Sequence, residues 1–559
     1  MRTMMRATMR RTLALAAIFA AGAAPAVSAP LWDDITAQTI GTTAEWTSKV
    51  ELTDLDGDGW VDIVFPNGGD YATAGTPEPQ RVFRNLGNWT GPPPHFEDIS
   101  ARVFGAAGTR LSRVIKVRDV DGDGDLDVFV GGAHGTASAL FLQGPAGAFT
   151  DASAQLPAGP VYLGDAEFGD VDGDGDLDLV LADWGGPPED VAGGPVRLWL
   201  NDGRGRFTDA SARLPAVTLG MSWDLELIDF DDDGDLDVVV SSKLSAGGRA
   251  FVNDGAGHFT DDTAARLPQR TNNYEYEAMD IDGDGDLDLV TINDGPDLTE
   301  TVLVNDGAGR FTDETAARLP GANNLAGSDD NVAVFLDVDD DGDADVLIGS
   351  LSDADRLLVN DGHGRFTMDA SVLTTPATPG TLGLAVADLD HDGRLDVVMS
   401  QGEAATPDHV FRGNAGVARD TRPPAVRVLV APARAGGTVI ARVHDHRSPS
   451  RDADWKAVTI ETELASSLAM RWRGEYEWAA VLPDSADDLA YRVCATDAAG
   501  NQACSEVQRA SGSRGGGGAG PGGHGGGGAG CQAGGTPPSL VLAWMVVRAI
   551  RRSRRQARA

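Results

Sequence analysis

Sulfur, aromatic rings and positive charge are all scarce in this sequence. Only 3 of its 559 residues are cysteine and 6% are aromatic, so a disulfide-rich scaffold is excluded as the basis of the fold. Lysine and arginine number 45 against 85 aspartates and glutamates, which gives a formal net charge of −40. Such an acidic chain argues against nucleic acid and anionic lipid surfaces as partners. The 9 histidines are scattered and no nucleophile motif occurs, so no residue is predicted to be catalytic.

Aspartate, by contrast, is abundant and regularly placed. The nine-residue loop D-x-D-x-D-G-x-x-D occurs seven times, beginning at Asp54, Asp119, Asp170, Asp229, Asp280, Asp337 and Asp388. Calcium takes six to eight oxygen ligands in a tight turn where alternate side chains and one carbonyl face inward. Glycine stands at the sixth position of every copy and makes the sharp bend. The sequence therefore predicts about seven bound calcium ions.

The predicted ligands are the carboxylates of positions 1, 3, 5 and 9 and the backbone carbonyl of position 7. The carboxylates belong to Asp54, Asp56, Asp58 and Asp62; Asp119, Asp121, Asp123 and Asp127; Asp170, Asp172, Asp174 and Asp178; Asp229, Asp231, Asp233 and Asp237; Asp280, Asp282, Asp284 and Asp288; Asp337, Asp339, Asp341 and Asp345; and Asp388, Asp390, Asp392 and Asp396. The carbonyls belong to Trp60, Asp125, Asp176, Asp235, Asp286, Asp343 and Arg394. Because a nearby positive charge opposes calcium, the loop with Arg394 is predicted to bind most weakly.

Each loop is expected to lie between two strands. An EF-hand would continue into a helix and carry Glu at position 12, whereas here β-rich runs such as Asp237-Val238-Val239-Val240 follow. The alternative is that the loops are acidic, solubilising turns without a metal. Four facing carboxylates would then repel one another and raise their pKa values.

The repeat length indicates the fold. Successive loops start 65, 51, 59, 51, 57 and 51 residues apart, which suits a four-stranded propeller blade. The second half of each repeat reads as a strand, an Asn-Asp-Gly-x-Gly turn and Phe-Thr-Asp, the pattern of a tight hairpin. The seventh repeat lacks its last strand, and Leu31 to Thr36 supply an equivalent one. The sequence therefore predicts an all-β, seven-bladed β-propeller over residues 30–417, closed by its N-terminal strand.

These loops resemble the FG-GAP/VCBS repeats of integrin α chains, with traces of the name-giving motif at Phe168-Gly169. The resemblance implies calcium loops on the lower face and ligand binding on the upper face. Residues entering the innermost strands would lie there, and Trp46, Tyr162, Trp223 and Tyr274 are the candidate ligand contacts. Aromatic rings suit sugar stacking or peptide binding. The alternative is that these rings pack between blades.

Four further segments flank the predicted ring. Residues 1–29 have the features of a secretory signal peptide. Residues 421–508 predict a small Ig/FnIII-like β-sandwich, in which Cys494 and Cys504 either pair in an oxidising compartment or remain free thiols. Residues 511–535 form a glycine-rich linker. Residues 536–559, a short apolar run with an arginine cluster, resemble the MYXO-CTERM sorting tail, with Cys531 as the processing site, or form a disordered basic tail.

Together these features predict a secreted, cell-surface-anchored calcium-binding propeller that serves as an adhesion or ligand-binding platform for a protein or glycan. We expect a monomer that is not an enzyme. Two alternatives remain open: a calcium-dependent polysaccharide lyase or glycoside hydrolase, and a structural component of the envelope or matrix.

Overall fold

The computed structural model describes residues 30–70, 73–186, 193–243, 247–293, 299–351, 354–369, 380–402, 406–451, 454–464 and 467–512. The predicted signal peptide (1–29), nearly all of the glycine-rich linker (511–535) and the predicted sorting tail (536–559) with Cys531 lie outside these residues. Within the described part, no helix is both long enough and apolar enough to span a membrane.

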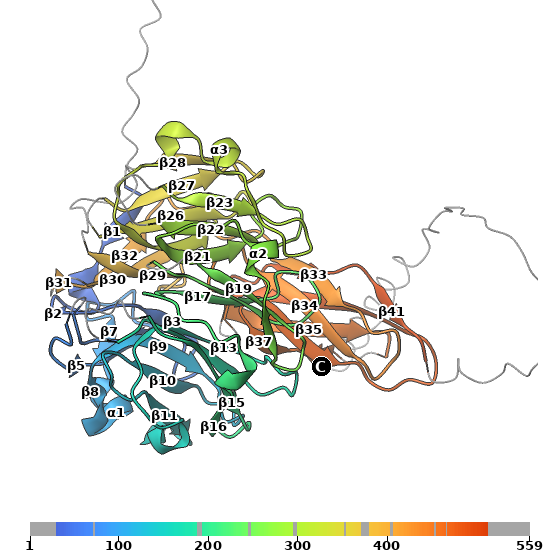
Figure 1. Cartoon of the computed structure of the whole chain (residues 1–559), viewed down its shortest axis with the longest axis horizontal. Coiled ribbons are helices and arrows are strands. Elements are labelled where there is room, and N and C mark those ends of the chain that lie inside the picture. Colours follow the sequence, from blue (N-terminus) through green and yellow to red (C-terminus); the bar gives the residue numbers. More distant parts are fainter. Residues whose placement is uncertain are drawn as a thin grey trace, which may run out of the picture. The chain divides into compact units, whose positions relative to one another are not determined.

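Seven four-stranded antiparallel sheets form the blades (Figure 1). The first three comprise β3 (Glu51–Thr53), β4 (Asp62–Phe65), β6 (Arg81–Asn85) and β7 (Phe96–Asp98); β9 (Ser112–Arg118), β10 (Asp127–Gly132), β11 (Ala139–Gly144) and β12 (Ala148–Asp151); and β13 (Leu163–Gly169), β14 (Asp178–Asp183), β15 (Val196–Asn201) and β16 (Phe207–Asp209). The fourth and fifth comprise β17 (Leu225–Ile228), β18 (Asp237–Val240), β19 (Arg249–Asn253) and β20 (Phe259–Asp261); and β21 (Asn273–Met279), β22 (Asp288–Asn293), β23 (Thr301–Val304) and β24 (Thr312–Asp313). The sixth and seventh comprise β25 (Asp330–Leu336), β26 (Asp345–Ser350), β27 (Arg356–Asn360) and β28 (Phe366–Asp369); and β29 (Thr381–Ala387), β30 (Asp396–Gln401), β32 (His409–Gly413) and β1 (Trp32–Asp34).

Short elements connect the blades. Two small ribbons pair β2 (Ala44–Glu45) with β31 (Thr406–Pro407) and β5 (Glu78–Pro79) with β8 (Thr109–Arg110). The helices are α1 (Ser100–Phe104), α2 (Thr263–Arg266), α3 (Thr315–Arg318), η1 (Thr36–Gln38), η2 (Gly105–Gly108), η3 (Ser153–Gln155), η4 (Ser211–Arg213) and η5 (Gly321–Asn323). None exceeds five residues within the described part, so strands supply the core.

The blades form a closed ring. Each innermost strand contacts that of the next blade, in the order β3, β9, β13, β17, β21, β25, β29 and back to β3. The seventh blade is completed by β1, which pairs with β32 so that Trp32 lies opposite Gly413. Trp32 is fully buried, and its indole Nε1 donates to the carbonyl of Leu395 at 2.9 Å. The predicted seven-bladed fold and its closure by the N-terminal strand are therefore confirmed.

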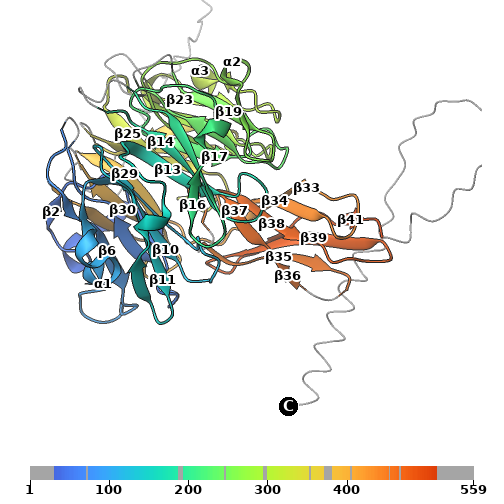
Figure 2. The ribbon, with the colours of Figure 1, turned by 60° about the horizontal axis from the view of Figure 1, so that its bottom comes forward.

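A separate β-sandwich follows the ring (Figure 2). One sheet contains β33 (Ala425–Val430), β34 (Thr438–His444), β38 (Glu477–Val481) and β37 (Arg471–Gly474). The other contains β36 (Ser467–Ala469), β35 (Trp455–Thr462), β39 (Leu489–Asp497) and β40 (Gln502–Cys504), and β41 (Gln508–Ala510) also pairs with β39. Val439, Ile460 and Val493 are fully buried between the sheets, and a disulfide joins Cys494 to Cys504.

Candidate metal centres

The seven acidic loops connect the first and second strands of each blade, and position 1 organises the turn. In the first loop, Asp54 Oδ1 accepts the backbone N–H of Asp58 at 3.0 Å, and Oδ2 accepts that of Gly59 at 2.7 Å. The loops of Asp229, Asp337 and Asp388 repeat this pattern. The sixth-position glycines all have φ between 85° and 96°, a conformation that a side chain would strain.

Position 9 joins each loop to the third strand of its blade. Asp62 Oδ2 accepts the N–H of Leu55 at 3.1 Å, and Oδ1 accepts that of Asn85, on β6, at 2.7 Å. All seven carboxylates at this position are at most 1% exposed. Burial, with a smaller contribution from nearby carboxylates of the same loops, raises the pKa to about 8 for Asp62, Asp178, Asp288 and Asp345. Without a cation, these side chains would hold protons near neutral pH.

Position 3 directs one oxygen into the loop. In the loops of blades three, four and five, Oδ2 of this aspartate pairs with an arginine from the end of the same blade: Asp172 with Arg213 at 3.5 Å, Asp231 with Arg266 at 2.9 Å, and Asp282 with Arg318 at 2.7 Å. The other oxygen, Oδ1, is buried and has no hydrogen-bond donor among the described residues at Asp56, Asp172, Asp231 and Asp282. A buried carboxylate oxygen without a donor is costly, so this arrangement fits a cation inside the loop.

Carboxylate oxygens converge at several loops. Ligand atoms lie within 4.8 Å of one another in sets that include Asp54, Asp56 and Asp58; Asp119, Asp121 and Asp127; Asp170, Asp172 and Asp178; Asp229, Asp231 and Asp237; and Asp280, Asp282 and Asp288. The donor set is oxygen alone, the preference of a hard cation such as calcium. The residues present therefore fit the predicted metal.

An asparagine that we expected only to shape a turn ties neighbouring loops together. Asn305 Nδ2 donates to the carbonyl of Leu287 in its own loop at 3.0 Å and to that of Phe230 in the preceding blade's loop at 2.8 Å. The equivalent donors, with the same pair of acceptor positions, are Asn85, Gln143, Asn201, Asn253 and Asn360. The backbone N–H of Ala418 completes the circle by donating to Val338 at 2.9 Å.

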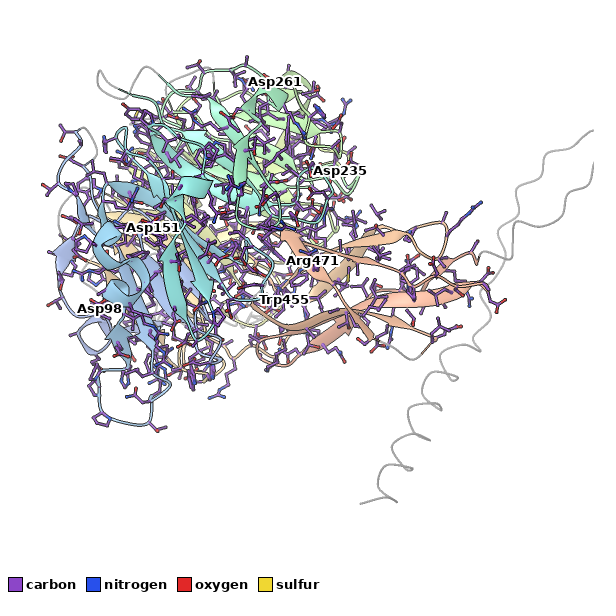
Figure 3. All side chains as sticks on the ribbon, turned by 90° about the horizontal axis from the view of Figure 1, so that it is seen from below. Asp98, Asp151, Asp235, Asp261, Trp455 and Arg471 are labelled. Carbon is purple, nitrogen blue, oxygen red and sulfur yellow. A yellow bond between two sulfur atoms is a disulfide. The ribbon has the colours of Figure 1, made fainter. Side chains whose placement is uncertain are left out.

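Arginines of the sandwich contact the loops of blades three, four and five. Arg473, on β37, donates to the carbonyl of Gly234 at 2.8 Å, and Arg442, on β34, donates to that of Asp229 at 2.6 Å. Arg427, on β33, pairs with Asp286 at 2.7 Å. Arg471 lies at the boundary between the two domains (Figure 3), where its Nη1 would be 3.3 Å from a Cβ at Gly175. This interface could not be predicted from the sequence, because arginine on a strand is ordinarily a solvated residue.

The predicted ligand-binding rings have mixed environments. Trp223 and Tyr274 are 4% and 2% exposed, and their ring centroids are 5.7 Å apart. Trp184 packs against Trp223 at 5.2 Å, and the half-buried Tyr162 packs against this group. Trp46 is also half-buried, but its backbone contacts Glu78 in blade one. The structure therefore brings three of the four rings together, and two of those three are buried between blades.

A small cavity of about 90 Å³ lies among the inner strands of the ring. Its lining includes Trp223 and several acids, of which Asp165 pairs with Lys49 at 2.8 Å. Burial and then neighbouring acids raise the pKa of Glu226 and Glu277 well above the usual range.

Comparison with known proteins bears on the repeats. The FG-GAP-like repeat family matches residues 119–181, 189–240, 229–291, 280–348 and 337–399, while curated proteins gave no match. Among solved structures, an Agrocybe aegerita lectin that recognises non-reducing terminal N-acetylglucosamine is 20% identical over 58% of this chain and 81% of its own, with a TM-score of 0.36. A GH74 enzyme of Niastella koreensis is 12% identical over 85% of this chain and 74% of its own, with a TM-score of 0.39. These two likenesses are too distant to carry an argument about function. The five matches show that the chain contains FG-GAP-like repeats over residues 119–181 and 189–399.

Proposed function

We propose that this protein is a calcium-binding β-propeller, exported and held at the cell envelope, that serves as a platform for binding an extracellular protein or glycan. The observation that carries the calcium assignment is the set of buried position-3 oxygens without donors at Asp56, Asp172, Asp231 and Asp282. Each faces a loop whose other carboxylates already organise the turn. A bound cation would balance these charges and fix the turn between the first two strands.

Calcium suits these loops better than magnesium does. Calcium accepts six to eight oxygens in flexible geometry, whereas magnesium requires near-ideal octahedral geometry and keeps several waters. Each loop offers four side chains and one carbonyl, and a bidentate carboxylate raises that number further. Export also favours calcium, because extracellular concentrations fill sites with Kd values of about 10⁻⁴–10⁻³ M.

The ligand platform is proposed for the face opposite the acidic loops. The sandwich contacts the loop side, through Arg442 and Arg473 among others. At the other ends of the inner strands, the half-buried Tyr162 packs against the core cluster that contains Trp184 and Trp223, and the guanidinium of Arg113 is 4.7 Å from the Trp184 ring centroid. A partly exposed ring supported by packed neighbours can stack on a sugar or an apolar side chain.

The platform is tested by screening the purified chain against glycan and matrix-protein arrays in the presence of calcium. We expect Tyr162→Ala to weaken binding of any captured ligand at least tenfold, while thermal stability changes little. Trp46→Ala on blade one tests whether the second half-buried ring takes part. Unchanged binding in both variants would contradict this placement of the site. Release of cleaved sugar would instead favour the polysaccharide lyase or glycoside hydrolase alternative.

Anchoring at the envelope is tested separately by cell fractionation. We expect the full chain in the envelope fraction and a chain truncated after residue 512 in the medium. Recovery of the full chain in the cytosol would contradict the proposed location.

A further inference from the structure

The acidic loop of blade four has a carboxylate from the sandwich beside it. Glu477, on β38, is 2% exposed and lies opposite Arg442 in the pairing of β34 with β38. Arg473 Nη1 donates both to Glu477 Oε2 at 3.1 Å and to the loop carbonyl of Gly234 at 2.8 Å. Arg442 Nη2 donates to the carbonyl of Asp229, the first residue of the same loop, at 2.6 Å. Glu477 is therefore held between two arginines that both bind loop four.

The second oxygen of Glu477 is left without a donor. Its Oε1 is buried and receives no hydrogen bond from any described residue. Because the same guanidinium nitrogen of Arg473 binds Oε2 of Glu477 and the loop carbonyl of Gly234, the Glu477 carboxylate lies next to loop four. One oxygen of Glu477 thus accepts a hydrogen bond from an arginine that also contacts loop four, and the other is buried without a donor.

Loop four also contains more buried carboxylate oxygens without a hydrogen-bond donor than loop one does. Asp231 Oδ1 is buried without a donor, like its counterparts, and so is Asp237 Oδ2 at position 9. In loop one the equivalent Asp62 Oδ2 accepts the N–H of Leu55 at 3.1 Å. Three buried oxygens in loop four and β38, from Asp231, Asp237 and Glu477, therefore receive no hydrogen bond within the described residues.

We propose that the cation of loop four is shared between the two domains, with Glu477 supplying a carboxylate from the sandwich. This inference rests on the proposed calcium function. A divalent cation would be coordinated by all three oxygens and would thereby join β38 to the loop. Arg442 and Arg473 would orient the backbone and Glu477 without occupying the metal position. Loop four would then bind calcium more tightly than a loop that relies on its own residues, and its occupancy would strengthen the contact between propeller and sandwich.

The competing explanation is a proton. If Glu477 is a neutral acid, its hydroxyl can donate to Asp229 and no cation is needed. Glutamine reproduces the size and the donor of the neutral acid but not the charge of a ligand. Glu477→Gln therefore separates the two explanations, with Glu461→Gln as the matched control, since Glu461 pairs with Arg492 inside the sandwich at 2.7 Å.

The experiment is a calcium titration of the full chain, followed by native mass spectrometry and calorimetry. At limiting calcium, we expect Glu477→Gln to retain one ion fewer than the wild type and to show at least a tenfold weaker Kd at a single site. Asp231→Asn should remove the same ion, the double variant should lose no second ion, and Glu461→Gln should match the wild type. Wild-type binding by Glu477→Gln would overturn the shared site while leaving the calcium function intact. No binding by the wild type would instead refute the calcium function itself.

Hydrogen exchange supplies a readout independent of ion counting. With calcium, β37 and β38 should exchange more slowly in the wild type than in Glu477→Gln or Asp231→Asn, because the cation holds the interface closed. Protection that is equal in the wild type and both variants, at calcium concentrations that fill the site in the wild type, would contradict a cation shared between domains.

Discussion

The propeller and the sandwich are both built from small antiparallel sheets, yet they differ in where they place charged side chains. The propeller gathers carboxylates at the turn of every blade and buries the ninth-position aspartates to 1% exposure or less. The sandwich has an apolar core around Val439 and Val493, and a disulfide joins two of its strands. If the proposed cations bind, the propeller depends on them for part of its stability, whereas the sandwich is stabilised by covalent and apolar contacts.

Removing calcium should produce the largest difference between the two domains. Each filled site stabilises the propeller by about 2.7 kcal/mol when free calcium is 100 times its Kd, so depletion weakens all seven blades together. Hydrogen exchange followed by mass spectrometry should show faster exchange in β22 than in β39 after depletion. Equal loss of protection in both strands would contradict the claim that the propeller depends on calcium more than the sandwich does.

Changing the pH of the metal-free protein should produce the next largest effect. Burial raises the pKa of Asp288 and Asp345 in the folded state to about 8, which is above the pKa of aspartate in the unfolded chain. At pH values between the unfolded and the folded pKa, the folded state therefore binds more protons than the unfolded state does. Stability of the metal-free propeller should therefore be greatest near pH 4 and fall as the pH rises toward 8.

The calcium-loaded propeller should respond in the opposite direction, because acid protonates the ligands and releases the metal. Urea unfolding midpoints at pH 5.5, 7.0 and 8.5, with and without calcium, check both signs; these three values bracket the titration range near neutrality. A metal-free propeller that grows more stable with rising pH would contradict the charge repulsion inferred for the loops.

Breaking one link between loops should have a smaller, local effect. Asn305→Ala removes the donor from two carbonyls, those of Leu287 and Phe230, and should cost about 2–4 kcal/mol because both acceptors lose a buried partner. The exposed neighbour Asp306 is the control, since Asp306→Ala removes only the turn hydrogen bonds that Asp306 Oδ1 accepts from the backbone N–H groups of Ala308 and Arg310. Denaturant unfolding measures both variants, and equal costs would show that the link between blades is unimportant.

Removing the disulfide should give the smallest effect and should change the sandwich alone. Cys494 and Cys504 are separated by 10 residues, and closing so short a loop stabilises by roughly 2–3 kcal/mol. Cys494→Ala with Cys504→Ala should lower the melting temperature of the sandwich and leave the number of bound calcium ions unchanged. Loss of calcium in this variant would contradict the claim that the disulfide affects the sandwich alone.

Much of the ring could be predicted because the sequence motifs that specify it lie within single repeats. The D-x-D-x-D-G-x-x-D loop defines its own turn, since position 1 binds the N–H groups of positions 5 and 6 within the same nine residues, as Asp54 does. The strand at Leu31 to Thr36 was assigned to the last blade because the seventh repeat lacked its own. Both patterns can be recognised without knowing what the rest of the chain does.

Contacts across a blade or domain boundary could not be predicted in this way. Asn305 was expected to form a turn, and its second role depends on the carbonyl of Phe230, 75 residues away. Trp223 and Tyr274 are candidate ligand contacts or rings that pack between blades; in the structure Trp223 packs against both Trp184 and Tyr274, and Trp223 and Tyr274 are buried. The position of Glu477 beside Asp229 depends on how two domains meet, which no periodicity encodes.

The most direct test of the account is the calcium content of the purified chain, measured by elemental analysis after dialysis into buffer containing millimolar calcium and, in parallel, millimolar magnesium. We expect about seven calcium ions per chain, one for each acidic loop, with little magnesium retained and a higher melting temperature in calcium than in magnesium. A chain that retains no calcium and melts at the same temperature in both buffers would contradict it.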